Sequence, residues 1–300
     1  MKGFVLINGY PSGEKFYRPG ERIAVALRAL GVEVDVYRNG EVYAMVEGDG
    51  GVTVCTPHQK QYHFAVYLDK DKYLGKLLEE GGLKLFNSAT SVELCDDKMQ
   101  TYLSLLDSGL HLAESIAAPL CYTKEAKPNT EFLARVGDSL GFPLVAKKSY
   151  GSFGEGVQLI PGMPELIKQE ESWLHVPHFY QRYISQSQGR DIRAIVIGGK
   201  AVAAMERVAQ EGEFRSNIEL GGTGRKTDLQ PAYQQAAERA AQVLGLEYCG
   251  VDLLETKEGP IVCEVNSNAF FEGLENTTGI DVAALYAKHI YESMHTAIKK

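Results

Sequence analysis

Two strand-like segments near the end of this 300-residue chain limit its possible folds most tightly. Residues 247–255 and 260–266 flank a short turn-like stretch, and this order predicts an antiparallel hairpin. If the turn is centred on residue 258, Asp252 lies directly opposite Glu264. The chain is therefore expected to contain a sheet on which two carboxylates face each other.

The facing carboxylates predict a cation site on one face of this hairpin. Side chains alternate along a strand, so Asn266 lies beside Glu264, while Cys263 is expected on the opposite face, in the core. Like charges directly opposite destabilise a sheet by up to about 1 kcal/mol unless a cation lies between them. Carboxylate and amide oxygens suit Mg²⁺, which also shares substrate phosphates. The predicted metal ligands are Asp252, Glu264 and Asn266. The alternative is a solvated acidic face, because a slip of one residue would undo the pairing.

A glycine-rich segment between two strand-like runs is the second candidate site. Residues 147–156 read KKSYGSFGEG. Its glycines and serines let backbone N–H groups turn toward an anion, and Lys147 supplies positive charge beside them. No GK[ST] follows the glycines, so the segment is not a Walker loop. We expect an anion-binding loop, with a plain hairpin turn as the alternative.

A group of basic residues follows in the chain, at Arg193, Arg207, Arg215, Arg225 and Lys226. Arginines beside metal-binding carboxylates suit the recognition of phosphate or carboxylate. For each arginine alone, a surface ion pair is the alternative.

The first ninety or so residues predict a small open α/β domain. Strand-like runs occur at residues 2–8, 32–37, 65–68 and 83–87. A helix is expected from Glu21, after Pro19-Gly20, to Leu30, ending at Gly31. Strand, helix and strand in this order indicate a parallel sheet. The first strand is not followed by GxGxxG, which counts against an NAD-linked oxidoreductase.

The rest of the chain predicts mixed α+β subdomains. A helix is expected to begin near residues 96–98, with Asp96 or Asp97 as its cap and Met99, Leu103 and Leu106 on its apolar face, and Asp281 is expected to cap the last helix. Further strands are expected at residues 142–148, 156–160, 180–185, 191–197 and 201–207, and helices at 164–172 and 231–244.

Composition excludes several classes of protein. No run approaches the roughly 18–20 apolar residues of a membrane helix, and the opening MKGFVLING reads as a buried strand rather than a signal peptide. The five cysteines form no CxxC pair, which is typical of reduced thiols in a cytoplasmic protein. A formal charge of -8 argues against nucleic-acid binding. His175 and His178 have a spacing seen in metal sites but lack further ligands, so a packed or surface role is expected.

Ten short segments carry a family resemblance. They are residues 97–98 (DK), 143–147 (PLVAK), 181–184 (QRYI), 189–193 (GRDIR), 206–207 (ER), 212–217 (GEFRSN), 250–252 (GVD), 264–266 (EVN), 272–275 (EGLE) and 277–279 (TTG). Their order resembles the ATP-grasp superfamily, and specifically the RimK-like α-L-glutamate ligases. The resemblance implies an ATP-grasp fold with an N-terminal Rossmann-like (pre-ATP-grasp) α/β domain at 1–94. A lid subdomain would follow at 95–183 and a C-terminal subdomain with the metal site at 184–300.

The resemblance also implies the roles of individual residues. ATP would lie between the lid and the C-terminal subdomain. Its expected contacts are Lys98, Lys147, Ser149, Gly151, Ser152, Gly154, Gly156, Gln181, Arg182, Tyr183, Ile184, Asp191, Arg193, Arg215, Ser216 and Asn217. Residues 181–184 would hold adenine mainly through backbone groups, and Asp191 would bind the ribose. Arg207, Arg215 and Lys147 would act in catalysis beside the metal.

The implied activity is an ATP-dependent carboxylate–amine ligation that releases ADP and requires Mg²⁺, with Mn²⁺ as an alternative ion. The acceptor carboxylate would form an acyl phosphate, and an amine, such as that of glutamate or a related amino acid, would displace phosphate. The acceptor would be a peptide, a protein or a small molecule. No nucleic-acid or membrane partner is expected, and relatives often form homo-oligomers. The alternative is a nucleotide-binding regulator that has lost turnover.

Two departures from the family pattern bear on substrates. Arg182 stands where the family usually has an acidic residue, and since adenine contacts there are mainly backbone, ATP binding is expected to survive. After Asn266 the chain reads SNAFF rather than the Ala-Ser-Pro-Gly of members that modify ribosomal protein. A different acceptor is therefore expected.

Overall fold

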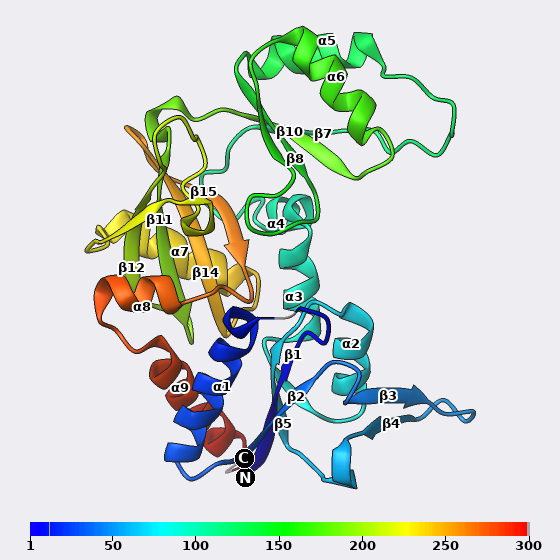
Figure 1. Cartoon of the computed structure of the whole chain (residues 1–300), viewed down its shortest axis with the longest axis vertical. Helices are drawn as coiled ribbons and strands as arrows, with labels where there is room; N and C mark the ends of the chain where they lie inside the picture. Colours follow the sequence, from blue (N-terminus) through cyan, green and yellow to red (C-terminus); the bar gives the residue numbers. More distant parts are fainter. Residues whose placement is uncertain (12, 299–300) are drawn as a thin grey trace.

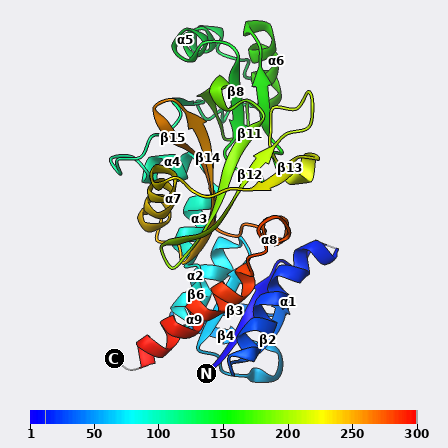
Figure 2. The same cartoon turned by 90° about the vertical axis from the view of Figure 1, so that its left-hand side faces the viewer.

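A computed structural model of the chain describes residues 1–11 and 13–298. The protein consists of three units stacked along its long axis (Figure 1). The N-terminal unit forms the base, a small lid forms the top, and the sheet of the C-terminal unit lies between them. The view turned by 90° shows the same elongated stacking (Figure 2).

The N-terminal unit is the expected parallel α/β sheet. Its strands are β1 (Lys2–Ile7), β2 (Glu33–Arg38), β5 (Phe64–Leu68) and β6 (Lys84–Phe86), in the order β2-β1-β5-β6. Helices α1 (Glu14–Ala29) and α2 (Lys72–Glu80) pack on it. An unpredicted hairpin of β3 (Tyr43–Val46) and β4 (Val52–Cys55), followed by the 3-10 turn η1 (Pro57–Gln59), projects from the side (Figure 1).

The prediction that the first helix starts at Glu21 was wrong, because α1 begins at Glu14 and contains Pro19 and Gly20. Both residues are buried, and a Cβ on Gly20 would meet Ile7 of β1 at 3.0 Å. Close packing of the helix on the sheet therefore outweighs the hydrogen bond that proline cannot donate.

Helices α3 (Ala89–Asp96) and α4 (Lys98–Ser104) lead from the base toward the lid (Figure 1). An aspartate caps α4 as predicted, and of the two candidates it is Asp97, which accepts hydrogen bonds from the backbone of Met99 and Gln100. The predicted apolar face was wrong, since Leu103 and Leu106 are 49% and 58% exposed. The buried side instead carries Lys98, Thr101 and Tyr102.

The lid is a small antiparallel sheet covered by two helices (Figure 1). Its elements are β7 (Ser115–Ala117), α5 (Thr130–Leu140), β8 (Leu144–Lys148), β9 (Val157–Ile160), α6 (Met163–Trp173) and β10 (His178–Arg182), with sheet order β7-β10-β8-β9. Strand β10 ends at Arg182, three residues before the predicted end. His178 is buried in the lid, where its Nε2 lies 2.7 Å from Glu170, whereas His175 is exposed. The two histidines therefore have the packed and surface roles that we expected.

The C-terminal unit is a five-stranded antiparallel sheet. Its elements are η2 (Ser185–Ser187), β11 (Arg190–Ile197), β12 (Lys200–Val208), η3 (Ile218–Leu220), β13 (Thr223–Lys226), α7 (Pro231–Val243), β14 (Tyr248–Thr256), β15 (Gly259–Asn266), α8 (Glu272–Thr278) and α9 (Val282–Ile298). The strand order is β13-β12-β11-β14-β15.

The two faces of this sheet have different partners. Helix α7 covers one face with a continuous apolar core. On the other face, residues such as Ile195 and Tyr248 share a core with α9 and the N-terminal unit, and α9 packs against α1. The remainder of that face carries the polar residues described next. The chain divisions near residues 95 and 183 stay predictions.

Candidate active site

The hairpin of β14 and β15 has the predicted pairing at its functional end. Asp252 pairs with Glu264, and Gly250 pairs with Asn266. The turn is Lys257-Glu258, half a residue earlier than assumed, because Thr256 pairs with Gly259. The pairing of the two carboxylates nevertheless holds, because a bulge restores the register before it reaches Asp252.

That bulge lies at Cys263 and overturns the prediction that this thiol is in the core. Leu253 pairs with Val262 and Asp252 with Glu264, so Cys263 is the extra residue. Val262 and Val265 both point into the α7 core, and the two residues between them both line the polar cavity. The Sγ of Cys263 accepts a hydrogen bond from Lys147 Nζ at 3.6 Å.

A ladder of alternating charges crosses three strands on the polar face. Arg207 donates to both oxygens of Asp191, at 2.7 and 2.5 Å, and Arg193 donates to both oxygens of Asp252, each at 2.7 Å. Arg207 also lies 2.8 Å from Asp252, which joins the two pairs. All four side chains are nearly buried. The ladder is neutral, which makes its burial tolerable.

The ladder fixes the charge state of Asp252. Burial alone raises the pKa of this carboxyl, but the charges and hydrogen bonds of Arg193 and Arg207 outweigh burial and lower the pKa to about 2. Burial opposes the charge on Arg207, yet Asp252 and Asp191 raise the pKa of its guanidinium. Asp252 is therefore ionised across the physiological range.

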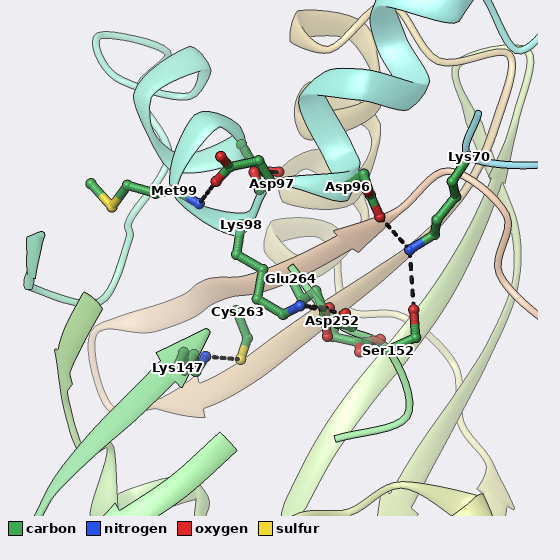
Figure 3. Close-up of polar contacts among 12 residues, drawn as sticks. Lys70, Asp96, Asp97, Lys98, Met99, Lys147, Ser152, Asp252, Cys263 and Glu264 are labelled. Carbon is green, nitrogen blue, oxygen red and sulfur yellow. Dashed lines mark hydrogen bonds and ion pairs between the residues drawn. The ribbon is translucent and has the colours of Figure 1, made fainter. Parts of the chain in front are cut away.

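Glu264 completes the acidic pair beside this ladder. Lys98 Nζ lies 3.4 Å from Glu264 and donates to the carbonyl of Gly151 at 2.6 Å, so α4, the glycine-rich loop and β15 meet at one ammonium (Figure 3). The amide nitrogen of Asn266 is buried without a partner. Rotation of that amide would present its oxygen at the same place.

The donor chemistry here fits Mg²⁺. Among the residues that the structure describes, no three His, Cys, Asp or Glu side chains cluster into a closed metal site. Two carboxylates and one amide oxygen form the open set expected of an ion that takes its other ligands from phosphate and water. Asp252, Glu264 and Asn266 are the residues that would hold it.

The glycine-rich loop is held by side chains from both the C-terminal and the N-terminal unit. Arg215 donates to the carbonyl of Gly154 at 2.9 Å and pairs with Glu213 at 2.8 Å. Lys70, from the N-terminal unit, donates to Ser152 at 3.1 Å and lies 2.7 Å from Asp96 (Figure 3). The loop turns at glycines with positive φ, among them Gly154 at 75°. These contacts position it over the cavity.

The cavity between β8–β10 of the lid and the polar sheet face, called the nucleotide cavity after the contacts predicted for it, has a volume of about 860 Å³ including its mouth. The predicted site residues that line it are Lys98, Lys147, Gly151, Gly154, Gln181, Arg182, Tyr183, Ile184, Asp191, Arg207, Arg215, Ser216, Asn217, Asp252 and Glu264. Its apolar wall includes the aliphatic side chains of Val145, Val157, Ile184 and Leu254. Three of these four residues were missed, because a strand valine or leucine in a sequence does not reveal whether it faces a cavity or a core.

The remaining predicted contacts lie elsewhere. Ser152, Arg193 and Asn266 line a second cavity. Ser149 and Gly156 line neither cavity. The Ser149 carbonyl accepts a hydrogen bond from the backbone of Lys98 at 2.9 Å, and the Gly156 carbonyl accepts one from Lys148 at 2.8 Å, so both shape the loop base. Arg225 and Lys226 are exposed on β13 and do not join the other arginines.

Two predicted adenine-contacting residues turn their side chains toward the protein. Gln181 donates to Tyr102 at 2.9 Å and to Ser115 at 3.0 Å. Arg182 donates to the carbonyls of Ser139 and Leu140 at the end of α5, at 2.8 and 2.9 Å, and pairs with Glu114. The unusual arginine therefore caps a lid helix, which leaves the backbone of this segment facing the cavity.

The second cavity lies between the N-terminal unit and the end of β15, with a volume of about 1310 Å³ including its mouth. Asn8 and Asp69, which follow β1 and β5, line one side, and the segment from Asn266 to Phe271 lines the other. Strand order reverses between β1 and β5, where open α/β sheets bind ligands. Asn217 and Glu264 line both cavities, so the two cavities meet there.

No helix within residues 1–11 and 13–298 is long and apolar enough to cross a membrane.

Comparisons with known proteins agree with this architecture. The chain resembles a probable alpha-L-glutamate ligase of Marinomonas sp. (strain MWYL1), with 36% identity over 70% of this chain and 67% of that protein. It also resembles a probable alpha-L-glutamate ligase of Cellvibrio japonicus (strain Ueda107), with 40% identity. That match covers 55% of this chain and only 58% of the Cellvibrio protein.

Two solved structures share the fold. One is the D-alanine–D-alanine ligase from Bacillus anthracis complexed with ATP, with a TM-score of 0.74, 21% identity, and coverage of 100% of this chain and 99% of that one. The other is the ATP-grasp ligase PsnB complexed with minimal precursor, Mg and ADP, with a TM-score of 0.70, 16% identity and 97% of each chain covered. Identity this low shows the fold alone, which is the ATP-grasp fold. The model of the RimK-like ATP-grasp domain matches residues 95–290, and the chain therefore belongs to the RimK-like ATP-grasp family.

Proposed function

We propose that this protein is an ATP- and Mg²⁺-dependent ligase that joins a carboxylate to an amine and releases ADP and phosphate. One observation carries the proposal: the nucleotide cavity and the second cavity meet at Asn217 and Glu264, beside the ammonium of Lys98. A phosphoryl donor in one cavity and a carboxylate in the other would react at that junction.

The nucleotide cavity supports binding of ATP with a defined direction. Its apolar wall, which includes Val145 and Leu254, suits a purine ring. Lys98, Lys147 and Arg215 lie toward the glycine-rich loop, where they would contact the phosphates. In this direction the γ-phosphate points at the second cavity.

The three predicted metal-binding residues would act through the ion that they hold. Mg²⁺ held by Asp252, Glu264 and Asn266 would neutralise charge on the phosphates during transfer. Arg193 and Arg207 keep Asp252 ionised, as a carboxylate ligand of a metal must be.

Two balanced steps account for amide formation. A carboxylate oxygen of the acceptor attacks the γ-phosphorus, the bond to the β-phosphate oxygen breaks, and ADP leaves with that electron pair. The amine nitrogen then attacks the acyl carbon, inorganic phosphate leaves, and the nitrogen loses its proton to solvent. No protein nucleophile is required. Cys263 fits this scheme as a bystander, because burial raises the pKa of its thiol even though Lys147 partly opposes the shift.

The family favours glutamate or a related amino acid as one substrate, with a peptide, protein or small molecule as the other. A nucleotide-binding regulator without turnover is the alternative, and one observation favours it: both oxygens of Asp252 are already paired with arginines. In that case ATP would bind without amide formation.

The test is phosphate and ADP release with ATP and Mg²⁺, screened over amino acids and candidate carboxylates, with products identified by mass spectrometry. We expect a mass gain of one amino acid for each ADP formed. ATP binding without any product across a broad panel would contradict the ligase and favour the regulator.

A further inference from the structure

The second cavity has an unusual wall of aromatic side chains. Phe153 of the glycine-rich loop stacks on Phe270, with ring centroids 5.6 Å apart and planes 15° apart. Phe16 of α1 contacts both rings edge-on, at 6.3 and 5.9 Å. All three rings line the cavity and remain partly exposed. Residues from three distant segments of the chain thus build one apolar surface.

The charged side chains that line this cavity already have partners: Lys70, Arg193 and Glu264 lie in ion pairs, and Asp69 is hydrogen-bonded to neutral amides. Lys70 lies 2.7 Å from Asp96, and Glu264 lies 3.4 Å from Lys98. Arg193 is bound to Asp252, as described above. Asp69 accepts hydrogen bonds from the side chains of Asn8 and Asn39. Within the described part of the chain, the wall offers no unpaired cation for a substrate with a second carboxylate.

Lys15 is the nearby cation to consider. Among the side chains that the structure describes, it has no carboxylate partner, and its ammonium lies over the rings of Phe16 and Phe153, at 4.9 and 5.4 Å from their centroids. It does not line the cavity. Lys15 therefore stabilises the aromatic wall from outside and does not place a positive charge inside the cavity.

Amide groups on the opposite side have spare hydrogen-bonding capacity. Asn266 Nδ2 and Asn268 Oδ1 are both buried without a partner, although Asn268 Nδ2 donates to the carbonyl of Asp69 at 3.0 Å. Leaving a buried polar group without a partner destabilises the folded protein, so a ligand that supplies the partner gains affinity. With Asn266 holding the metal, Asn268 Oδ1 remains available, and a ligand that donates a hydrogen bond, as a peptide N–H does, would satisfy it.

We infer that the second cavity takes the carboxylate end of an amino acid or peptide whose terminal side chain is apolar and of aromatic size, rather than acidic. The reacting carboxylate would lie toward Glu264, the peptide N–H against Asn268, and the side chain against Phe16, Phe153 and Phe270. The inference rests on the proposed function and narrows it. A glutamate side chain in this cavity would leave its second carboxylate without a partner.

The test is calorimetry of the full chain saturated with Mg²⁺ and AMPPNP, titrated with glycyl-phenylalanine, glycyl-leucine and glycyl-glutamate. We expect glycyl-phenylalanine to bind at least tenfold more tightly than glycyl-glutamate. Phe270→Ala should weaken glycyl-phenylalanine at least tenfold, Phe270→Leu should weaken it less than threefold, and Phe270→Arg should reverse the preference. Tyr122→Arg, at a side chain that is 88% exposed and lines neither cavity, is the matched control and should change nothing.

The possible outcomes distinguish an error in the substrate preference from an error in the proposed ligase function. Equal or tighter binding of glycyl-glutamate, no binding of any dipeptide, or no effect of Phe270→Ala would overturn the inference while leaving the ligase proposal standing. Failure of the wild-type chain to bind AMPPNP with Mg²⁺ would instead remove the proposed function. AMPPNP binding by each variant shows that it has folded.

Discussion

Arg207 on β12 lies directly opposite Asp191 on β11 and donates two hydrogen bonds to its carboxylate. Asp191 was expected to bind ribose, yet in the structure its oxygens hold an arginine that also contacts Asp252. The relationship makes Arg207 the central positive charge of the ladder, and its removal would leave two buried carboxylates with one arginine between them.

Arg207→Met is therefore expected to destabilise the protein by ~3–5 kcal/mol, because breaking a buried ion pair leaves uncompensated charge. Urea unfolding measures the change. Arg225→Met, at an exposed position on β13, is the matched control and should shift the free energy of unfolding by no more than about 0.5 kcal/mol. Equal stability of the two variants would show that the ladder carries no such energy.

The low pKa of Asp252 predicts a pH dependence of stability. The carboxyl titrates near its ordinary value of about 3.9 when unfolded and at about 2 when folded. Its contribution, on the order of 2–3 kcal/mol, is present above about pH 4 and is lost as the pH falls toward 2. The difference in unfolding free energy between wild type and Asp252→Asn should shrink over that window. A difference that stays constant from pH 5 to pH 2 would refute the assigned shift.

Arg182 is expected to matter for the lid rather than for ATP. Arg182→Ala removes the cap of α5 and a half-exposed ion pair, so a loss of about 0.5–1 kcal/mol is expected. ATP affinity should change less than twofold, because the guanidinium is held by the carbonyls at the end of α5 and by Glu114. Differential scanning calorimetry and nucleotide titration measure the two effects. A tenfold loss of ATP affinity with unchanged stability would reverse this assignment.

Cys263 tests whether the chemistry needs a protein nucleophile. Cys263→Ala should keep ligation within about threefold of wild type, because neither balanced step forms a bond to sulfur. Alkylation of wild type by iodoacetamide at pH 8 should be slower than that of a free thiol, since burial raises the pKa, and ATP should slow it further. A loss of activity beyond a hundredfold in Cys263→Ala would mean that the thiol takes part.

The hairpin of β14 and β15 shows which features could be predicted from the sequence and which could not. Alternation and turn position were enough to predict that Asp252 faces Glu264. The predicted turn was half a residue too late, and the bulge at Cys263 restores the predicted register at Asp252. No local sequence pattern predicts that bulge. Its cause is tertiary, because Val262 and Val265 both pack against the α7 core.

Other errors have the same origin. The start of α1 was misjudged because its packing on the sheet outweighs the local effect of Pro19. The buried face of α4 was misjudged because tertiary contacts, rather than the positions of the leucines, decide which side of the helix is buried. The aromatic wall could not be predicted at all, since Phe16, Phe153 and Phe270 meet only in the folded chain. By contrast, cap residues such as Asp97 and the parallel order of the first strands follow from local patterns.

The most direct test of the account is the Mg²⁺-dependent, ADP-forming ligation rate of Glu264→Gln, measured with the substrates identified by the screen. This change removes one of the two facing charges and keeps the size of the side chain. Glu258→Gln, in the exposed turn of the same hairpin, is the matched control. We predict a loss of at least a hundredfold for Glu264→Gln with nucleotide still bound, and no change for Glu258→Gln. Undiminished ligation by Glu264→Gln would contradict the assignment of this sheet face as the reaction centre.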